Sequence, residues 1–132
     1  MDRGGEVAIW RYDPKRDAAP EIAEPGELDE RRAVFLASPG EGSRPRAWIA
    51  VDGYDGTEAT VLFDAPAGDE FGKYVRALVA TAIEEATALG FTSLLAHWRA
   101  GWGSAEGVLA ELGFTQGAPG MWRRALDSSL VN

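Results

Sequence analysis

The stretch FGKYVRALVATAIEEATALGF, residues 71–91, carries the strongest structural pattern in the chain. Its apolar residues recur every three or four positions, which predicts an amphipathic helix over residues 70–89. Asp69 is the expected N-cap, and Gly90 supplies the left-handed residue that ends the helix. The apolar positions of this helix are Phe71, Tyr74, Val75, Leu78, Val79, Ala82, Ile83, Ala86 and Leu89.

Four short segments upstream of the helix have the apolar content and alternation of β-strands. They cover residues 6–12, 33–37, 46–51 and 59–63, and their spacing predicts a meander. Residues 13–31 between the first two contain three prolines and many acidic residues, and no apolar residue repeats there at helical spacing. We expect this segment to be a long loop.

A strand, a second helix and a last strand are predicted downstream. Residues 92–98 form the first of these strands, a helix capped by Ser104 stops at Gly113, and residues 120–126 form the last strand. A crossover after an antiparallel meander predicts an α/β (α+β) protein with a mixed sheet flanked by helices. The length of 132 residues fits one domain over residues 1–132, with a short flexible tail at 127–132.

Two similar tetrapeptides mark where helices end: ALGF at residues 88–91 and ELGF at residues 111–114. Together with the closing segment MWRRAL at 121–126, this order resembles the GNAT superfamily of N-acetyltransferases over residues 58–126. The resemblance implies a GNAT-like fold that lacks the usual two helices after the first strand. It also implies acyl transfer from an acyl-CoA to an amine.

The phosphate-binding loop of the GNAT family departs most from its pattern in this chain. The family carries Gln/Arg-x-x-Gly-x-Gly/Ala before the long helix, where backbone N–H groups meet the pyrophosphate of coenzyme A. Aligned on residues 76–79, Glu70 takes the Gln/Arg position, and Lys73 and Val75 take the two glycine positions. A carboxylate there repels phosphate, whereas Lys73 and Arg76 can bind it through their side chains. The cofactor that the family resemblance implies is acetyl-CoA or another acyl-CoA.

The second helix departs from the family as well. Many GNAT enzymes place an Asn before this helix and a Tyr within it, and the Tyr protonates the departing thiolate. The corresponding positions here are Trp102 and Leu109, and neither side chain can donate that proton.

The ends of the strands at residues 59–63 and 92–98 separate in a GNAT-like fold and open the reaction site. His97 is the only histidine, and an imidazole ordinarily titrates near neutrality, so His97 is the natural general base or acid there; a surface histidine at a strand end is the other interpretation. Asp64 can orient or stabilise it from the neighbouring strand. Trp98, Arg99 and Trp102 can hold a planar ligand by stacking, while core packing is the other interpretation of both tryptophans.

Composition excludes several classes of function. The chain has no cysteine and one histidine, which excludes disulfides, thiol catalysis and a multi-histidine metal site, and we expect no metal. A net charge of −8 disfavours nucleic acid and anionic membranes as partners. Without an apolar leader or spanning segment, we expect a cytoplasmic protein that binds a small molecule.

Three functions remain open at this point. The first is a small acyl-CoA-dependent N-acyltransferase acting on a small-molecule amine. The second is a GNAT-fold protein that does not use CoA: a lyase, cyclase or isomerase with His97 as acid/base, or a binder of an aromatic metabolite. The third is a non-catalytic interaction module.

One face of the predicted sheet has few elements to cover it. The residues of that face are Val34, Leu36, Trp48, Ala50 and Leu62, and only the short second helix and the proline-rich loop are available there. We therefore expect a homodimer that buries Trp48, and Trp10 beside it.

Overall fold

The computed structural model describes residues 7–13, 15–17, 33–40, 44–53, 57–66, 68, 70–97, 105–117 and 121–126. Those residues form seven strands and two helices. The strands are β1 (Ala8–Arg11), β2 (Ala33–Ser38), β3 (Ala47–Gly53), β4 (Glu58–Asp64), β5 (Ser93–His97), β6 (Thr115–Gln116) and β7 (Met121–Ala125). The helices are α1 (Phe71–Ala88), between β4 and β5, and α2 (Ala105–Glu111), between β5 and β6.

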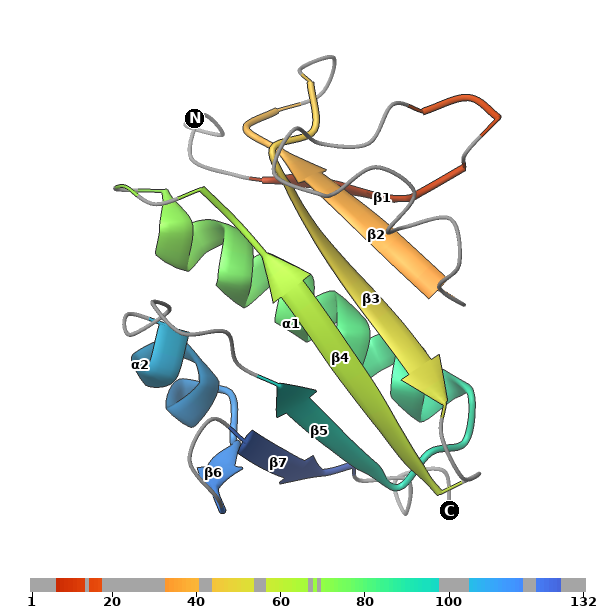
Figure 1. The fold of residues 1–132 in the computed structure, drawn as a ribbon, viewed down its shortest axis with the longest axis vertical. Helices are drawn as coiled ribbons and strands as arrows, with labels where there is room; N and C mark the ends of the chain where they lie inside the picture. Colours follow the sequence, from red (N-terminus) through yellow and green to blue (C-terminus); the bar gives the residue numbers. More distant parts are fainter. Residues whose placement is uncertain are drawn as a thin grey trace, which may run out of the picture.

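All seven strands belong to one mixed sheet in the order β1-β2-β3-β4-β5-β7-β6 (Figure 1). β1 to β4 form the predicted antiparallel meander. β4 and β5 are parallel and are joined through α1, and β7 runs antiparallel to both β5 and β6. The structure therefore confirms the predicted α+β class and the mixed sheet.

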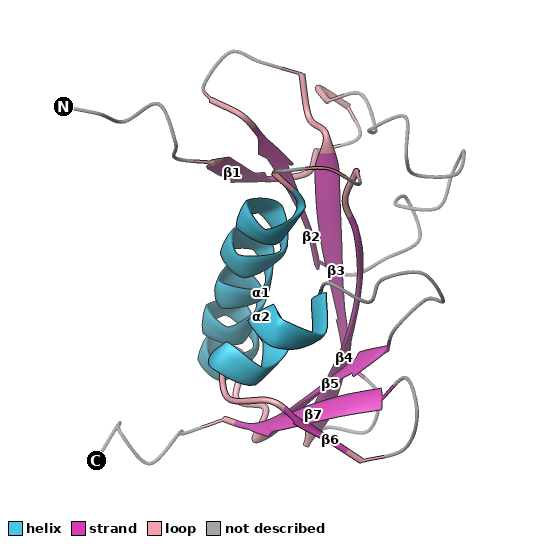
Figure 2. Cartoon of the chain, turned by 90° about the vertical axis from the view of Figure 1, so that its left-hand side faces the viewer, coloured by secondary structure: helices cyan, strands magenta, loops and turns pink. Residues whose placement is uncertain are grey.

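Both helices lie on the same face of the sheet (Figure 2). The apolar stripe of α1 packs on the inward positions of the meander, and these include Ile49, Val61 and Phe63. The prediction that the short second helix covers the opposite face is wrong. Its buried residues Ala105, Val108 and Leu109 belong to the same core cluster as α1.

The opposite face of the meander holds a second, smaller apolar cluster. Val34, Leu36, Trp48 and Ala50 are buried there, with Trp10, Tyr12 and Leu62 packed against them. Trp48 has an exposed fraction of 0% within the single chain, so a second copy is not needed to bury it. The homodimer prediction loses this argument and stays untested. Most of the proline-rich loop, from residue 18 to 32, lies outside the described residues.

Glycines end both helices in the left-handed conformation, as the sequence predicts. Gly90 has a φ of 94° and Gly113 a φ of 95°. The start of α1 differs slightly from the prediction, because Glu70 holds the N-cap position and makes no side-chain capping hydrogen bond there. Asp69, the predicted cap, lies outside the described residues, and so does Ser104.

Candidate active site

The parallel pairing of β4 with β5 stops before either strand ends. The ladder runs from Glu58 opposite Ser93 to Val61 opposite Ala96. β4 continues to Asp64, which is paired with Trp48 of β3, and β5 continues to His97, which is paired with Met121 of β7. Among the described residues, the end of β4 is thus paired with β3 but not with β5, and the end of β5 is paired with β7 but not with β4. In Figure 1, the arrows of β4 and β5 diverge toward their carboxyl ends, as the family resemblance predicts.

Asp64 is the last residue of β4, where the chain turns toward α1. Its side chain is half-buried, and its Oδ1 accepts a hydrogen bond of 3.0 Å from the backbone N–H of Ala65. This bond fixes one carboxylate oxygen against the backbone. Asp64 is also the cross-strand neighbour of Trp48, so the two side chains leave the sheet on the same face.

His97 is the last residue of β5, and its backbone position follows from the register. Ala96 lies opposite Val61, so His97 is one residue beyond the last pair and Asp64 is three residues beyond it. The offset between the two positions is two residues, or about 6–7 Å along the strands. Only the backbone of His97 belongs to the described part of the chain. Trp98, Arg99 and Trp102 lie outside the described residues.

The first turns of α1 hold Lys73 and Arg76, the two basic residues that the sequence assigns to the cofactor. Both are half-exposed, and each contacts a carboxylate. Lys73 Nζ lies 3.5 Å from Glu70 Oε1 on the same helix. Arg76 Nη1 lies 2.6 Å from Glu111 Oε1 of α2. Both cations are therefore open to solvent and partly neutralised.

The structure corrects the alignment of the phosphate loop. Lys73 and Val75 were aligned with loop glycines, but both lie inside α1, and Val75 is fully buried in the core. The segment that precedes the helix instead contains Gly68, whose φ of 132° favours glycine. The carbonyl of Gly68 accepts a hydrogen bond of 3.2 Å from the backbone N–H of Phe71, the first residue of the helix.

Gly72 is the one glycine within the first turn of α1, and it faces α2. A Cβ atom on Gly72 would lie 4.0 Å from a methyl group of Val108. α2 also carries Leu109, the residue at the family's tyrosine position, and Leu109 is fully buried in the core. The side chain of Leu109 therefore cannot give a proton to a leaving thiolate, and Gly72 has no side chain that could replace it.

Tyr74 is a buried titratable group that the sequence pattern marks only as part of an apolar stripe. It lies on α1 with an exposed fraction of 2%. Burial raises the pKa of Tyr74 above its ordinary value of 10.0; the charge of Arg46 opposes this rise and that of Glu70 adds to it. The apolar repeat of the helix predicts that Tyr74 is buried. The effect of Arg46 on its pKa could not be predicted, because Arg46 lies in a distant part of the sequence.

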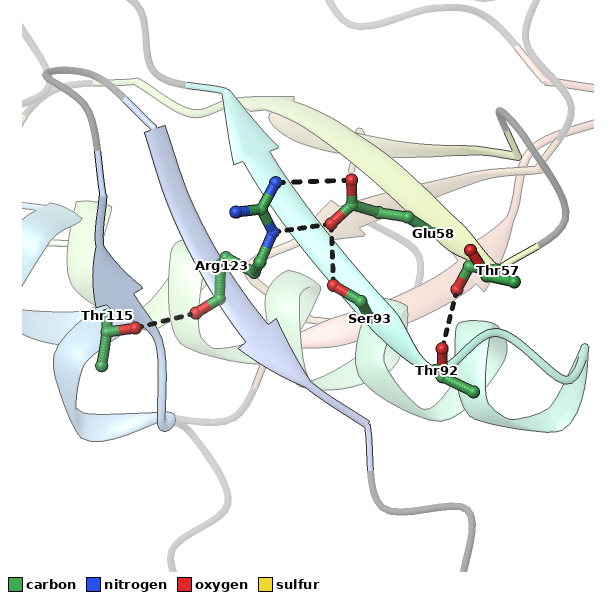
Figure 3. A network of polar contacts seen from close by, with 6 residues as sticks. All are labelled: Thr57, Glu58, Thr92, Ser93, Thr115 and Arg123. Atoms are coloured by element: carbon green, nitrogen blue, oxygen red, sulfur yellow. Dashed lines mark hydrogen bonds and ion pairs between the residues drawn. The ribbon is translucent and has the colours of Figure 1, made fainter.

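A polar network holds the other end of β4 (Figure 3). Arg123 of β7 donates from Nε to Glu58 Oε2 over 2.7 Å, and Ser93 of β5 donates to the same oxygen over 2.8 Å. Three neighbouring strands are joined where their ladder is intact. The strands are therefore tied at the Glu58 end and part at the Asp64 end.

The described residues offer neither a metal site nor a membrane span. They contain no group of three or more His, Asp or Glu side chains placed to hold a metal ion. No helix among them is long and apolar enough to cross a membrane.

Comparison with solved structures identifies the fold. A GNAT-family acetyltransferase from Staphylococcus aureus Mu50 matches with a TM-score of 0.71 and 11% identity, over 91% of this chain and 99% of that chain. An IAA acetyltransferase from Bacillus cereus matches with a TM-score of 0.70 and 18% identity, over 92% of this chain and all of that chain. A Salmonella typhimurium protein solved with its cofactor acetyl-CoA matches with a TM-score of 0.58 and 18% identity. That match covers 72% of this chain, which spans 65% of the Salmonella protein.

These likenesses show that the chain has the fold of the GNAT superfamily, and they confirm the resemblance found in the sequence. No protein-family model matches the sequence. No curated protein matches it either.

Proposed function

We propose that this chain is a small N-acyltransferase that uses acetyl-CoA or another acyl-CoA and acts on a small-molecule amine. The observation that carries the proposal is the separation of β4 and β5 beyond Val61 and Ala96, with α1 beginning just after β4. Such an opening exposes backbone groups and polar side chains to a ligand in an otherwise continuous sheet. The shared fold with acetyltransferases supports the same reading.

The positive charges at the start of α1 suit the phosphate groups of an acyl-CoA. Lys73 and Arg76 are half-exposed cations on the first turns of a helix, where the helix dipole also favours negative charge. Glu70 stands beside Lys73 and opposes such a ligand. We assign Lys73 and Arg76 to phosphate binding by their side chains, without the glycine pair that the family uses.

The chemistry at the strand ends requires one proton acceptor. A bound acyl-CoA would supply a thioester. Its acyl carbon would bond to the amine nitrogen, and the carbon–sulfur bond would break to release the CoA thiolate, which would take a proton from solvent. His97 takes the proton that the amine loses, because an imidazole is largely neutral at pH 7 and above. Asp64 favours the protonated imidazole through its negative charge. Trp98, Arg99 and Trp102, which follow His97 in the chain, are assigned to the acceptor.

Binding of the cofactor is tested by thermal unfolding with acetyl-CoA. A ligand at one hundred times its Kd stabilises the folded state by about 2.7 kcal/mol, which for a chain of this length raises the Tm by about 10 °C. Lys73→Gln should reduce this shift. Lys15→Gln removes the same charge near the N-terminus and should leave it unchanged. No rise in Tm at millimolar acetyl-CoA would refute the proposal.

The role of His97 is tested separately, by turnover. His97→Ala should lower kcat by about 10²–10⁴-fold, which is the usual contribution of a general base, and leave the acetyl-CoA shift in Tm intact. Equal kcat in the variant and the wild type would remove His97 from the mechanism while leaving cofactor binding in place.

A GNAT-fold protein that does not use CoA is the second candidate. The observation in its favour is that both candidate phosphate ligands, Lys73 and Arg76, already contact carboxylates. Thermal unfolding separates the two candidate functions, because a chain that does not use CoA should not be stabilised by acetyl-CoA. A homodimer and a cytoplasmic location remain proposals beside either function.

A further inference from the structure

Arg76 and Glu111 join the two helices beside the proposed phosphate site. Arg76 lies in the second turn of α1 and Glu111 is the last residue of α2. Their side chains meet at 2.6 Å and have exposed fractions of 52% and 61%. The contact is thus short, yet both groups remain open to solvent and to a ligand.

We propose that Glu111 competes with the phosphate of an acyl-CoA for Arg76, so that a bound cofactor weakens the ion pair between α1 and α2. The proposal rests on the proposed use of an acyl-CoA. A guanidinium group binds phosphate best through two parallel N–H groups. Glu111 Oε1 lies 2.6 Å from one of these nitrogens, Nη1, so its negative charge stands where a phosphate oxygen would approach the guanidinium group.

The geometry distinguishes Glu111 from the carboxylate beside Lys73. Glu70 lies on the same helix as Lys73, at a distance of 3.5 Å and a spacing of three residues. That pair belongs to one rigid element. The Arg76–Glu111 pair instead spans two helices, so a ligand that captures Arg76 releases a contact of α2. Binding at α1 is thereby coupled to the end of α2.

The expected size of the competition follows from the exposure of the pair. Exposed ion pairs are weak, and losing one changes an affinity by about two- to fivefold. Glu111→Gln should therefore tighten the binding of coenzyme A by that factor. Arg76→Gln should weaken it, since it removes a phosphate ligand.

The test is calorimetric titration of coenzyme A into the wild type, Glu111→Gln, Arg76→Gln and the double variant. Glu106→Gln is the matched control, because Glu106 is an exposed carboxylate at the other end of α2. The proposal requires that Glu111→Gln tightens binding more than Glu106→Gln does. It also requires that this gain disappears when Arg76 is already Gln, as expected for two residues that act on each other.

Each other outcome overturns the proposal in an identifiable way. A gain that persists in the Arg76→Gln background, or that Glu106→Gln equals, shows only a general effect of net charge. An unchanged affinity in Arg76→Gln removes Arg76 from the site, while the proposed function stands. A failure of every variant and of the wild type to bind coenzyme A overturns the proposed function itself.

Discussion

Gly113 ends α2 with a backbone conformation that side chains tolerate poorly. Its φ is 95°, and a Cβ atom at this position would lie 3.1 Å from Nε of Arg124. That Nε donates a hydrogen bond of 2.7 Å to the carbonyl of Leu112, so the arginine cannot move away freely. Gly113 thus combines backbone strain with a close neighbour that is already engaged.

Gly113→Ala is therefore expected to lower the free energy of unfolding by about 1–2 kcal/mol. Gly107→Ala is the control, since Gly107 lies inside α2 and a Cβ atom there would have no atom within 4 Å beyond its chain neighbours and the backbone of its own helix. That substitution should stabilise the chain by about 0.5–1 kcal/mol, because alanine is the better helix former. Urea unfolding measures both values, and a destabilisation by Gly107→Ala would contradict this account of the helix.

Tyr74 makes the stability of the chain depend on alkaline pH. Its pKa is raised in the folded state, chiefly by burial, so the folded chain keeps the phenol proton after the unfolded chain has begun to release it. The contribution of Tyr74 is complete below pH 10 and is lost as the pH rises from there through the folded-state pKa. Tyr74→Phe should lose less stability than the wild type between pH 9 and pH 11. Equal losses in urea unfolding at these two pH values would show that Tyr74 titrates normally.

At the scale of elements, the sheet is tied at its two ends by different ion pairs. Arg123 joins β7 to Glu58 of β4, and hydrogen bonding and the negative charge of Glu58 raise the pKa of Arg123. Arg11 joins β1 to Glu85 of α1 at 2.8 Å and lies over the ring of Phe35. Each pair fastens one half of the sheet.

Arg123→Gln should speed amide hydrogen exchange in β5 and β7 and leave β1 and β2 unchanged. Arg11→Gln should speed exchange in β1 and β2 and leave β5 and β7 unchanged, because it loosens the edge strand β1 from α1. Local opening of this kind is what hydrogen exchange resolves. Faster exchange throughout the sheet in either variant would show that the sheet opens as one unit.

The sequence predicted the elements well where a periodic pattern was long, and poorly where position depends on the rest of the chain. The apolar repeat of α1 and the two glycine helix ends were predicted correctly, because they are local features. β6 was missed, since Thr115 and Gln116 are both exposed and show no alternation. The face of α2 was misassigned because β5 and β7 are antiparallel, and no handedness rule fixes which face their connection crosses.

The candidate site was predictable only in part for the same reason. The separation of β4 and β5 was expected from the family resemblance, and the positions of Asp64 and His97 at the strand ends were expected from the predicted strands. The partners of Lys73 and Arg76 did not: Glu111 is far from Arg76 in sequence, and only the packing of α1 on α2 brings the two together. The placement of loop glycines at Lys73 and Val75 failed because the helix starts at Phe71, before both residues.

At the scale of the whole molecule, the two faces of the sheet are buried in different ways. α1 and α2 cover one face (Figure 2). Trp48 marks the other face, where it is fully buried within the single chain. Among the described residues, its indole Nε1 has no hydrogen-bond partner. The buried volume of the ring therefore stabilises the fold, while the unpaired N–H group destabilises it.

Trp48→Phe should therefore change the free energy of unfolding by only about 1 kcal/mol, because relief from an unpaired buried N–H offsets the lost volume. Trp48→Ala should cost about 3–5 kcal/mol, since it leaves a cavity. Because Trp48 is buried in each separate chain, its fluorescence should also escape acrylamide quenching after dilution to a monomer confirmed by sedimentation. The wild type and Trp48→Phe should then have the same amount of quenchable emission. If quenching of Trp48 appears only on dilution, a second copy covers this face, and the homodimer prediction regains its argument.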